Sequence, residues 1–367
     1  MRLVYCLLSP TFGMHQYTAD LANRMIERHE VHLVTVPGYP ADRYAPAVHV
    51  HTPSRLTNTG LSVESLRFRR LSRFKAEILL VKPDMVHFTG PHLWNPYLLY
   101  WLKRRGIQTI HSLHDLHPHS GTPLKPFLRF WNRVVVRLSG RILVHGRCYQ
   151  QELLQSGLSI YRVVYFPLLH LFLSFRRTQT LIEKLEPVSY DPVILFFGRL
   201  EQYKGIITLI EAYRRYRTSE SLPTNTQQKL LFAGPGNIPE EWRTYQPEGI
   251  EWRNRLIDDD EAEALFRSCC VLVLPYDDAT QSALIGAAYF FHKPVIVTRS
   301  GALPEYVIEG QTGYVVPTLD VEVLANMLQS RLADKDVLKA MGDSGRKWYD
   351  EQRRLETHAL HNLYETD

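Results

Sequence analysis

The feature of this 367-residue sequence that most restricts its fold is the alternation of short apolar runs with longer segments of helical periodicity. Short runs rich in Val, Ile, Leu and Phe are typical of buried parallel strands, and the segments between them are typical of crossover helices. In the first half the expected strands are 3–8, 31–36, 85–90, 107–113 and 141–146, and the expected helices are 15–29, 62–81, 94–105, 124–139 and 148–156.

The same pattern restarts in the second half. The expected strands there are 193–198, 229–234, 249–253, 271–276 and 294–299, and the expected helices are 204–217, 259–268, 281–291, 303–308 and 320–332. The repeated block predicts an α/β protein with two Rossmann-like, doubly wound domains. We place the first domain at 1–170 and the second at 171–348, because 168–190 lacks a clear period and contains Pro187 and Pro192. Ligands bind at the carboxyl ends of parallel strands, so two such sheets facing each other would share one cleft.

Charge and hydropathy exclude several classes of protein. A net charge of +5 is too small to indicate a nucleic-acid partner, which usually needs a concentrated basic face. No apolar stretch approaches the roughly 20 residues that span a bilayer, and the first apolar run is too short for a signal peptide. The four cysteines form neither a CxxC motif nor a metal-ligand spacing. We therefore expect a cytoplasmic protein with reduced thiols.

Two cations follow the first strand of the second half. The segment FFGRLEQYKGIITLIEA, 196–212, places Arg199 after Gly198 and Lys204 five positions later, at the start of a helix. A guanidinium binds a diphosphate through paired hydrogen bonds, and an ammonium adds a compact charge. A solvated turn with two exposed cations explains the spacing equally well.

Two neighbouring segments are weaker signals. In LLFAGPGNIPE, 230–240, Gly234 and Gly236 would let the backbone approach a ligand closely, although an ordinary strand exit explains them almost as well. In RLIDDDEAEALF, 255–266, Asp258 and Asp260 resemble an Asp-x-Asp metal motif. We favour a capping box instead, because Asp258 and Glu261 precede an apolar helical face.

The segment 271–317 is the most informative. A strand ends at Pro275, a polar loop leads to a helix that begins near Gln281, and another strand ends at Thr298. The helix N-terminus offers unpaired backbone N–H groups and a positive dipole end, which suit a sugar hydroxyl or a phosphate oxygen. Gln281 and Ser282 lie at the mouth of this helix.

Ordered motifs across roughly 190–320 resemble the retaining glycosyltransferases of family 4, which have the GT-B fold. These motifs are GRLEQYKG, the Ala-Gly-x-Gly turn at 233–236, VLPY, KPVIVTRSGALPEYV and GQTGYVVP. The first half matches through TFGMHQYTADLA, the strand VHF, HDLHP at 114–118 and LVHG at 143–146. The resemblance implies an N-terminal acceptor domain and a C-terminal donor domain facing across a cleft, with a last helix, 349–367, that packs back on the first domain.

The resemblance also implies roles for individual residues. Arg199 and Lys204 would hold the donor diphosphate and stabilise the charge that develops on it, and His114 would lie near the transferred sugar. The donor-binding residues would be Gly13, Gly198, Gly234, Leu256, Gln281, Ser282, Ala283, Leu284 and Glu305. In this family retention is attributed to front-face attack in which the leaving phosphate takes the acceptor's proton. Neither a protein base nor a metal ion is expected.

The sequence departs from the family at two positions. Two glutamates eight positions apart usually meet the donor sugar and the ribose, and in this chain they fall on Ala279 and Ala287. The segment QSALIGAAY resembles a variant in which a Gln-Ser pair supplies the hydrogen bonds. The alternatives are a catalytically inactive partner subunit that binds a nucleotide sugar, and a GT-B-like epimerase that acts on UDP-sugars.

Histidines cluster after the strand at 107–113. The cluster comprises His111, His114, His117 and His119, with Asp115 among them, but its spacing is not that of a metal site. We expect His114 in the active site and the other three on a polar loop.

Two stretches, 66–75 and 126–141, are basic and amphipathic. The second carries Arg129, Arg133, Arg137 and Arg141 beside Phe127, Phe130 and Trp131. Such a face suits an anionic membrane that bears a lipid-linked acceptor, whereas the alternative is a Rossmann helix with its arginines in water. The sequence thus predicts a hexosyltransferase that moves a sugar from UDP or GDP to a glycan or a lipid-linked acceptor in polysaccharide or glycolipid synthesis, in the cytoplasm or at the inner face of the membrane.

Overall fold

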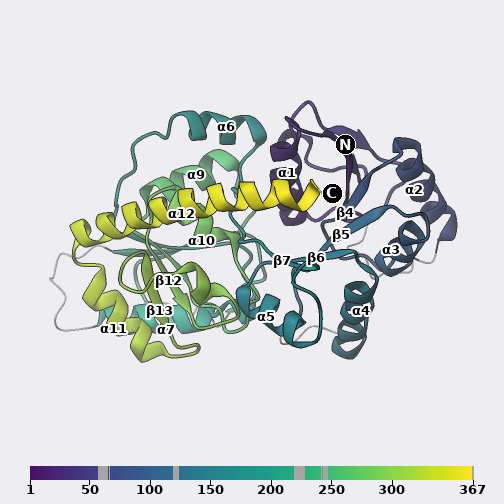
Figure 1. Ribbon diagram of the computed structural model, residues 1–367. Helices are drawn as coiled ribbons and strands as arrows, with labels where there is room; N and C mark the ends of the chain where they lie inside the picture. Colours follow the sequence, from purple (N-terminus) through teal and green to yellow (C-terminus); the bar gives the residue numbers. More distant parts are fainter. Residues whose placement is uncertain are drawn as a thin grey trace. The chain divides into compact units, whose positions relative to one another are not determined.

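The computed structural model of the chain describes residues 1–56, 65, 67–118, 124–218, 228–240, 242 and 247–365 (Figure 1). The chain forms two compact units: unit 1 is Met1–Lys184 with Leu355–Asp367, and unit 2 is Leu185–Arg354. The sequence analysis placed this boundary at 170/171. The difference arises from helix α6, Phe175–Glu183, which begins at a Ser174 cap in the segment that shows no clear period.

Unit 1 contains a seven-stranded parallel sheet in the order β3-β2-β1-β4-β5-β6-β7. The strands are β1 Arg2–Cys6, β2 Glu30–Val34, β3 His49–His51, β4 Met85–Phe88, β5 Gln108–Ser112, β6 Arg141–Val144 and β7 Val163–Tyr165. Its helices are α1 Phe12–Met25, α2 Phe68–Val81, α3 Asn95–Lys103, α4 Lys125–Leu138, α5 Arg147–Gln155 and α6. The core lies between the sheet and its helices, and includes Val4, Val34, Phe74, Phe88 and Leu98.

Unit 2 contains a six-stranded parallel sheet in the order β10-β9-β8-β11-β12-β13. The strands are β8 Val193–Phe197, β9 Lys229–Ala233, β10 Ile250–Arg253, β11 Val271–Leu274, β12 Val295–Thr298 and β13 Gly313–Val316. The helical segments are η3 Gln202–Lys204, α7 Ile206–Arg217, α9 Asp259–Ser268, α10 Ala283–Phe290, η4 Leu303–Tyr306 and α11 Val321–Arg331. The predicted fold class, two Rossmann-like α/β domains, is confirmed.

The last helix is longer than expected. Helix α12, Lys335–Tyr364, has 30 residues, so that its first part belongs to unit 2 and its last residues to unit 1 (Figure 1). Arg141 Nη1 donates to the carbonyl of Leu363 at 2.6 Å, and Arg24 pairs with Glu356 at 3.0 Å. These contacts fix the end of α12 on unit 1. Among the described residues, no helix is both long enough and apolar enough to cross a membrane.

Both sheets reverse their strand order beside their first strand. In unit 1, β2 and β3 lie on one side of β1, and β4 to β7 follow in order on its other side. In unit 2, β9 and β10 lie on one side of β8, and β11 to β13 lie on the other, so that β8 and β11 correspond to β1 and β4. The loops that leave such a pair of strands diverge and leave a crevice at the carboxyl edge. In each unit this is the point at which the fold most readily forms a ligand site.

Candidate active site

Lys204 lies at the point in unit 2 where the strand order reverses. Its Nζ donates to the phenol oxygen of Tyr276 at 3.1 Å and stands 4.4 Å from the centre of that ring. Lys204 ends η3 after β8, and Tyr276 follows β11, so the contact joins the two diverging loops. Gly205 starts α7 with φ +66°, and a Cβ there would stand 1.8 Å from the carbonyl of Pro275. This close approach holds Lys204 over the crevice.

Two glycines keep the ends of β8 and β9 close together. Gly198 has φ +119°, and a Cβ built there would stand 3.6 Å from both Lys204 Nζ and Leu284 Cδ1. Gly234 has φ +142°, and its Cβ would stand 2.1 Å from the carbonyl of Gly198. Neither conformation suits a residue with a side chain. The structure therefore brings Gly198, Gly234, Lys204 and Leu284 together at one sheet edge.

Arg199 takes a different direction from Lys204. Its side chain is 67% exposed, and Nη1 pairs with Glu201 Oε1 at 2.8 Å. It lines a cavity of about 690 Å³ whose other residues come from the loops after β8 and β9 and from the start of α7, and include Gln202, Pro235 and Trp242. This cavity lies within the size range of small-molecule sites. Lys204 faces Tyr276 instead, so the two expected phosphate ligands occupy separate parts of this edge.

The start of α10 presents polar groups beside Lys204. Ser282 is the N-cap, and its Oγ accepts a hydrogen bond from the backbone N–H of Leu284 at 3.4 Å. Ala283 is the first helical residue, so its N–H belongs to the set that α10 leaves without a helical acceptor. Gln281 Oε1 is buried and accepts no hydrogen bond within the described residues. An unpaired buried acceptor is costly, and a ligand hydroxyl would relieve that cost.

Alanine occupies the core at both positions where the family has glutamate. Ala279 and Ala287 are buried. The backbone N–H of Ala279 donates to Ser300 Oγ at 2.8 Å, and a Cβ on Gly301 would stand 1.8 Å from the Ala279 carbonyl. The backbone at Ala279 therefore packs closely against the turn at Ser300 and Gly301.

The carboxyl group of Asp277 is perturbed. Its Oδ1 is buried without a hydrogen-bond partner in the part of the chain that the structure describes. Burial first, and the charge of Asp278 second, raise the pKa of Asp277 from an ordinary 3.8 to about 6. Asp277 follows Tyr276 directly, so this buried carboxyl group with a raised pKa lies in the loop that contacts Lys204.

The other expected donor residues lie on neighbouring loops. Leu256 follows β10 and is exposed, and Glu305 lies half-buried in η4. Asp258 caps α9, and its Oδ1 accepts from the N–H of Glu261 at 2.9 Å, as the capping interpretation predicts. The reciprocal half of the capping box differs, because the Glu261 carboxylate pairs with Arg253 and Arg255 at 2.9 and 2.7 Å.

His114 lies at the carboxyl edge of the unit 1 sheet. Its Nε2 lies 2.9 Å from the carbonyl of Thr89, which can only accept, so Nε2 carries the proton and donates. Burial lowers the pKa of His114, which keeps the ring neutral and makes Nδ1 an acceptor. The ring of Tyr17 packs edge-on against it, with centres 4.8 Å apart. Gly13 stands at the start of α1, where no atom of the described residues lies within 4 Å of an added Cβ.

The other histidines of the cluster separate in space. His111 is buried, and its Nε2 accepts from Asn95 Nδ2 at 3.0 Å, which corrects its expected place on a polar loop. His117 is exposed and pairs with Glu152 at 2.8 Å, and His119 lies outside the described residues. Across the described ranges, no group of three His, Cys, Asp or Glu side chains could hold a metal ion.

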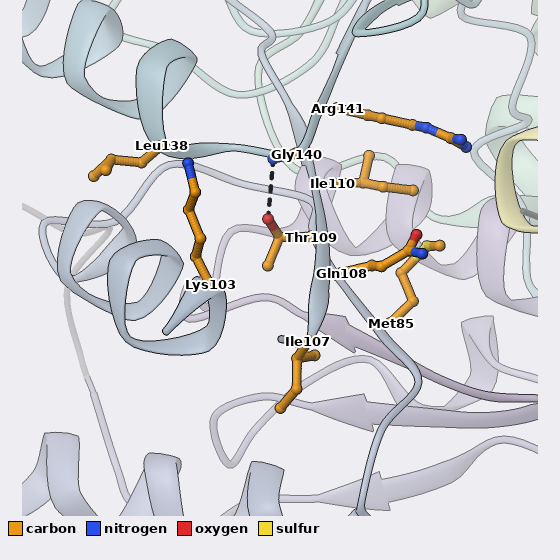
Figure 2. Close-up of a pocket in the computed structure, with 9 residues that line it drawn as sticks. All are labelled: Met85, Lys103, Ile107, Gln108, Thr109, Ile110, Leu138, Gly140 and Arg141. Atoms are coloured by element: carbon orange, nitrogen blue, oxygen red, sulfur yellow. Dashed lines mark hydrogen bonds between the residues drawn. The ribbon is translucent and has the colours of Figure 1, made fainter. Parts of the chain in front are cut away.

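A second cavity lies at the opposite edge of the unit 1 sheet. It has a volume of about 240 Å³ and is lined by residues at the amino ends of β4, β5 and β6 (Figure 2). Figure 2 shows Arg141 extending away from Lys103, and the backbone N–H of Gly140 donates to Thr109 Oγ1 at 3.1 Å. This cavity is remote from the strand ends that carry His114, so we do not assign the reaction to it.

Helix α4 carries the basic, apolar surface that the sequence predicts, with two corrections. Arg129, Arg133 and Arg137 are exposed, as are Phe127 and Phe130. Trp131 is buried in the core, and Arg141 is tied to the carbonyl of Leu363. In the stretch 66–75, Phe68 is exposed on α2, Phe74 is buried, and residue 66 lies outside the described residues.

Both halves of the chain match family models. Residues 12–168 match the model described as "Glycosyl transferase 4-like domain", and residues 191–334 match "Glycosyl transferases group 1". The D-inositol 3-phosphate glycosyltransferase of Corynebacterium glutamicum is 25% identical over 90% of this chain and 86% of its own. The N-acetyl-alpha-D-glucosaminyl L-malate synthase of Bacillus anthracis is 24% identical over 95% and 91%. The match to the Corynebacterium efficiens D-inositol 3-phosphate glycosyltransferase, 29% identical, spans 46% of this chain and less than half, 41%, of that protein.

Solved structures show the same fold at low identity. The sucrose-phosphate synthase of Thermosynechococcus elongatus has a TM-score of 0.74 at 18% identity and covers 99% of this chain and 98% of its own. The Anabaena protein HepE in complex with UDP has a TM-score of 0.72 at 15% identity, with full coverage of both chains.

Proposed function

Because the chain belongs to the glycosyltransferases of the GT-B fold, we propose that it transfers a hexose, with retention of configuration, from UDP or GDP to a glycan or lipid-linked acceptor. The observation that carries the proposal is the gathering of Lys204, Tyr276, Gly198 and the start of α10 where the strand order of unit 2 reverses. This is the edge at which open α/β sheets bind nucleotides. The relatives named above include a glycosyltransferase, and the structural neighbour HepE is in complex with UDP, which supports the donor class.

Lys204 and the backbone of α10 stabilise the leaving group in this proposal. When the bond between the anomeric carbon and the phosphate oxygen breaks, negative charge develops on the diphosphate. An ammonium and helix N–H groups already oriented toward that charge lower the barrier. Arg199 is exposed and its pairing with Glu201 is a surface ion pair, which costs little to break, so a bound diphosphate could recruit it.

The acceptor oxygen attacks the anomeric carbon from the face that the phosphate leaves, and its proton passes to the departing phosphate oxygen. This step needs neither a protein base nor a metal ion. His114 takes part by binding, because its neutral Nδ1 accepts a hydrogen bond from a sugar hydroxyl. Gln281 Oε1 accepts from a second hydroxyl, which replaces part of what a glutamate at position 279 would supply.

The test is a pair of substitutions that differ only in position. Lys204→Met keeps an unbranched side chain one atom shorter and removes its charge, and we expect kcat to fall about 100-fold or more. Lys103→Met makes the same change at the amino edge of unit 1, away from the proposed site, and should leave kcat unchanged. Equal rates for both variants would refute the role of Lys204.

Two other outcomes identify the alternative functions. Titration calorimetry with UDP and GDP, combined with an assay of donor consumption, separates them. Nucleotide binding without turnover for any donor and acceptor would indicate a partner subunit that has lost activity, in accord with Ala279 and Ala287. Conversion of the donor without an acceptor, with the nucleotide still attached to the sugar, would indicate an epimerase.

Helix α4 is proposed to contact an anionic membrane at the cytoplasmic face. Exposed arginines beside Phe130, which is 63% exposed, supply both charge attraction and apolar insertion. The protein should co-sediment with vesicles that contain phosphatidylglycerol and remain in solution with pure phosphatidylcholine. Replacing Arg129 and Arg133 by glutamate should abolish sedimentation, and unchanged sedimentation would exclude α4 as the contact.

A further inference from the structure

A chain of buried polar groups crosses unit 1 from the end of α12 to the carboxyl edge of the sheet. The phenol of Tyr5 donates to the phenol oxygen of Tyr364 at 3.1 Å, and Tyr364 lies 2.6 Å from Nδ1 of His87. On the other side of the ring, Nε2 lies 2.8 Å from Ser112 Oγ, which lies 2.7 Å from the phenol oxygen of Tyr17. These five residues are at most 5% exposed, so water does not replace any link.

The protons have one consistent order from Tyr5 to Ser112. Tyr364 accepts from Tyr5, so its own proton is directed at Nδ1 of His87. Burial holds the pKa of His87 well below its usual range, so the ring is neutral and its single proton lies on Nε2. Nε2 then donates to Ser112 Oγ, and the hydroxyls of Ser112 and Tyr17 share the last hydrogen bond, in which either oxygen can be the donor. Removing the Tyr364 hydroxyl therefore leaves His87 Nδ1 without its partner and frees the ring that positions Ser112 and Tyr17.

The chain ends against His114. The Tyr17 ring contacts the rings of His114 and His145 edge-on, with centres 4.8 and 5.1 Å away, and those two imidazoles lie 4.9 Å apart. Tyr17 is thus one wall of the space that His114 occupies. The hydrogen bond to Ser112 fixes the position of the Tyr17 ring against His114, because an edge-on ring contact alone would let the ring shift along its neighbour.

A buried polar network specifies positions more sharply than apolar packing does, since each member has one geometry that satisfies its partners. We propose that Tyr364, His87, Ser112 and Tyr17 are positioning residues that hold His114 in place for glycosyl transfer, so that the seating of the end of α12 sets the rate. The proposal rests on the proposed binding of the sugar by His114. The ion pair of Arg24 with Glu356 and the hydrogen bond from Arg141 to Leu363 keep Tyr364 at its end of the chain.

The first test is Tyr364→Phe, which removes one oxygen atom. We expect kcat to fall about tenfold, because small displacements of a positioned group are expensive in rate. The Kd for UDP should stay unchanged, since the nucleotide site is assigned to unit 2. Tyr5→Phe leaves the three links from Tyr364 to Tyr17 intact and should lower kcat less.

A matched control is Tyr213→Phe in unit 2. It also removes a buried phenol that hydrogen-bonds, in this case to the carbonyl of Gln228 at 2.6 Å, and it should leave kcat unchanged. Ser112→Ala should reproduce the loss of kcat, and Ser112→Thr, which keeps a hydroxyl, should restore most of it. Equal kcat for the wild type and Tyr364→Phe would overturn the proposal.

A second measurement does not depend on turnover. Nitrogen NMR of the wild type should show His87 protonated on Nε2, and Tyr364→Phe should shift the His87 signals. Protonation on Nδ1 in the wild type would overturn the proton order. A wild-type protein that transfers no sugar would refute the proposed function. In that case the His87 signals alone would still test whether the hydrogen bonds from Tyr364 to Ser112 exist.

Discussion

Asparagine at position 277 should stabilise the protein at neutral pH, and the gain should disappear in acid. Oδ1 of Asp277 is buried without a partner in the described structure, and the pKa of the group is raised from 3.8 to about 6. The folded state therefore keeps this proton over a pH range in which the unfolded chain has lost it. The contribution of Asp277 to stability falls as the pH rises from about 4 to about 6 and is constant above that range.

The size of the effect follows from the same shift. A carboxyl whose pKa lies about 2 above its unfolded value costs the folded state about 3 kcal/mol once it is ionised. Asp277 is only half-buried, and solvent screens its charge, so we expect about 1 to 2 kcal/mol. Asn resembles the protonated acid in shape and carries no charge, and it should recover that amount above about pH 6.

The assay is urea unfolding of the wild type and Asp277→Asn at pH values from about 4 to about 8. The two midpoints should coincide at the acidic end and diverge as the pH rises. Asp42→Asn, which removes an exposed charge in unit 1, is the control and should change the free energy of unfolding by less than about 0.5 kcal/mol at every pH. A constant difference between the wild type and Asp277→Asn across the whole range would refute the argument, because it would show that folding does not change the pKa of this group.

Two further predictions concern the donor unit. Gly234→Ala should destabilise the fold by about 2 to 5 kcal/mol and raise KM for the donor, because its Cβ would meet the Gly198 carbonyl at 2.1 Å; wild-type stability in urea unfolding would contradict this. Asp258→Ala should cost about 1 kcal/mol through loss of the α9 cap and leave kcat unchanged, whereas a fall in kcat that added Mg²⁺ reverses would restore the metal interpretation of Asp258 and Asp260.

The central strands could be predicted from the sequence, whereas three outer strands could not. Central strands such as β1 and β8 are covered on both faces and are therefore continuous apolar runs. Strand β3, His49–His51, is polar at alternate positions, β7 has three residues, and β13 begins with Gly313. Pairing with a neighbouring strand forms them, and that information is not local to the segment.

The start of α12 was missed because glycine is a poor helix former. Gly342 and Gly345 lie within this helix, and the structure shows why they are there. A Cβ on Gly342 would stand 1.9 Å from the carbonyl of His292, and one on Gly345 would stand 2.4 Å from the Tyr289 ring. The helix packs so closely that only glycine fits, and tertiary packing outweighs propensity at both positions.

The candidate site divides in the same way. Gly198, Lys204 and Ser282 follow strands or begin helices, so topology alone predicts that they share an edge. Arg199 has the same sequence context, but its flexible side chain pairs with Glu201 instead. The sequence gives no local signal for Tyr17, His87 and Ser112. Their connection depends on Tyr364, which lies 252 positions after Ser112 and contacts His87 only in the folded chain.

Unit 1 consists of two segments of the chain that are far apart in sequence, which affects how it folds during synthesis. Unit 2 is one uninterrupted stretch, whereas unit 1 needs residues from before and after it. During synthesis on the ribosome, the first 184 residues emerge long before Leu360, Leu363 and Tyr364, which cover buried surface of that unit. Domains generally complete in the order in which they are translated. In this chain unit 2 can therefore complete its fold before unit 1. Until the last turn of α12 is made, Tyr5 and His87 lack their hydrogen-bond partner Tyr364.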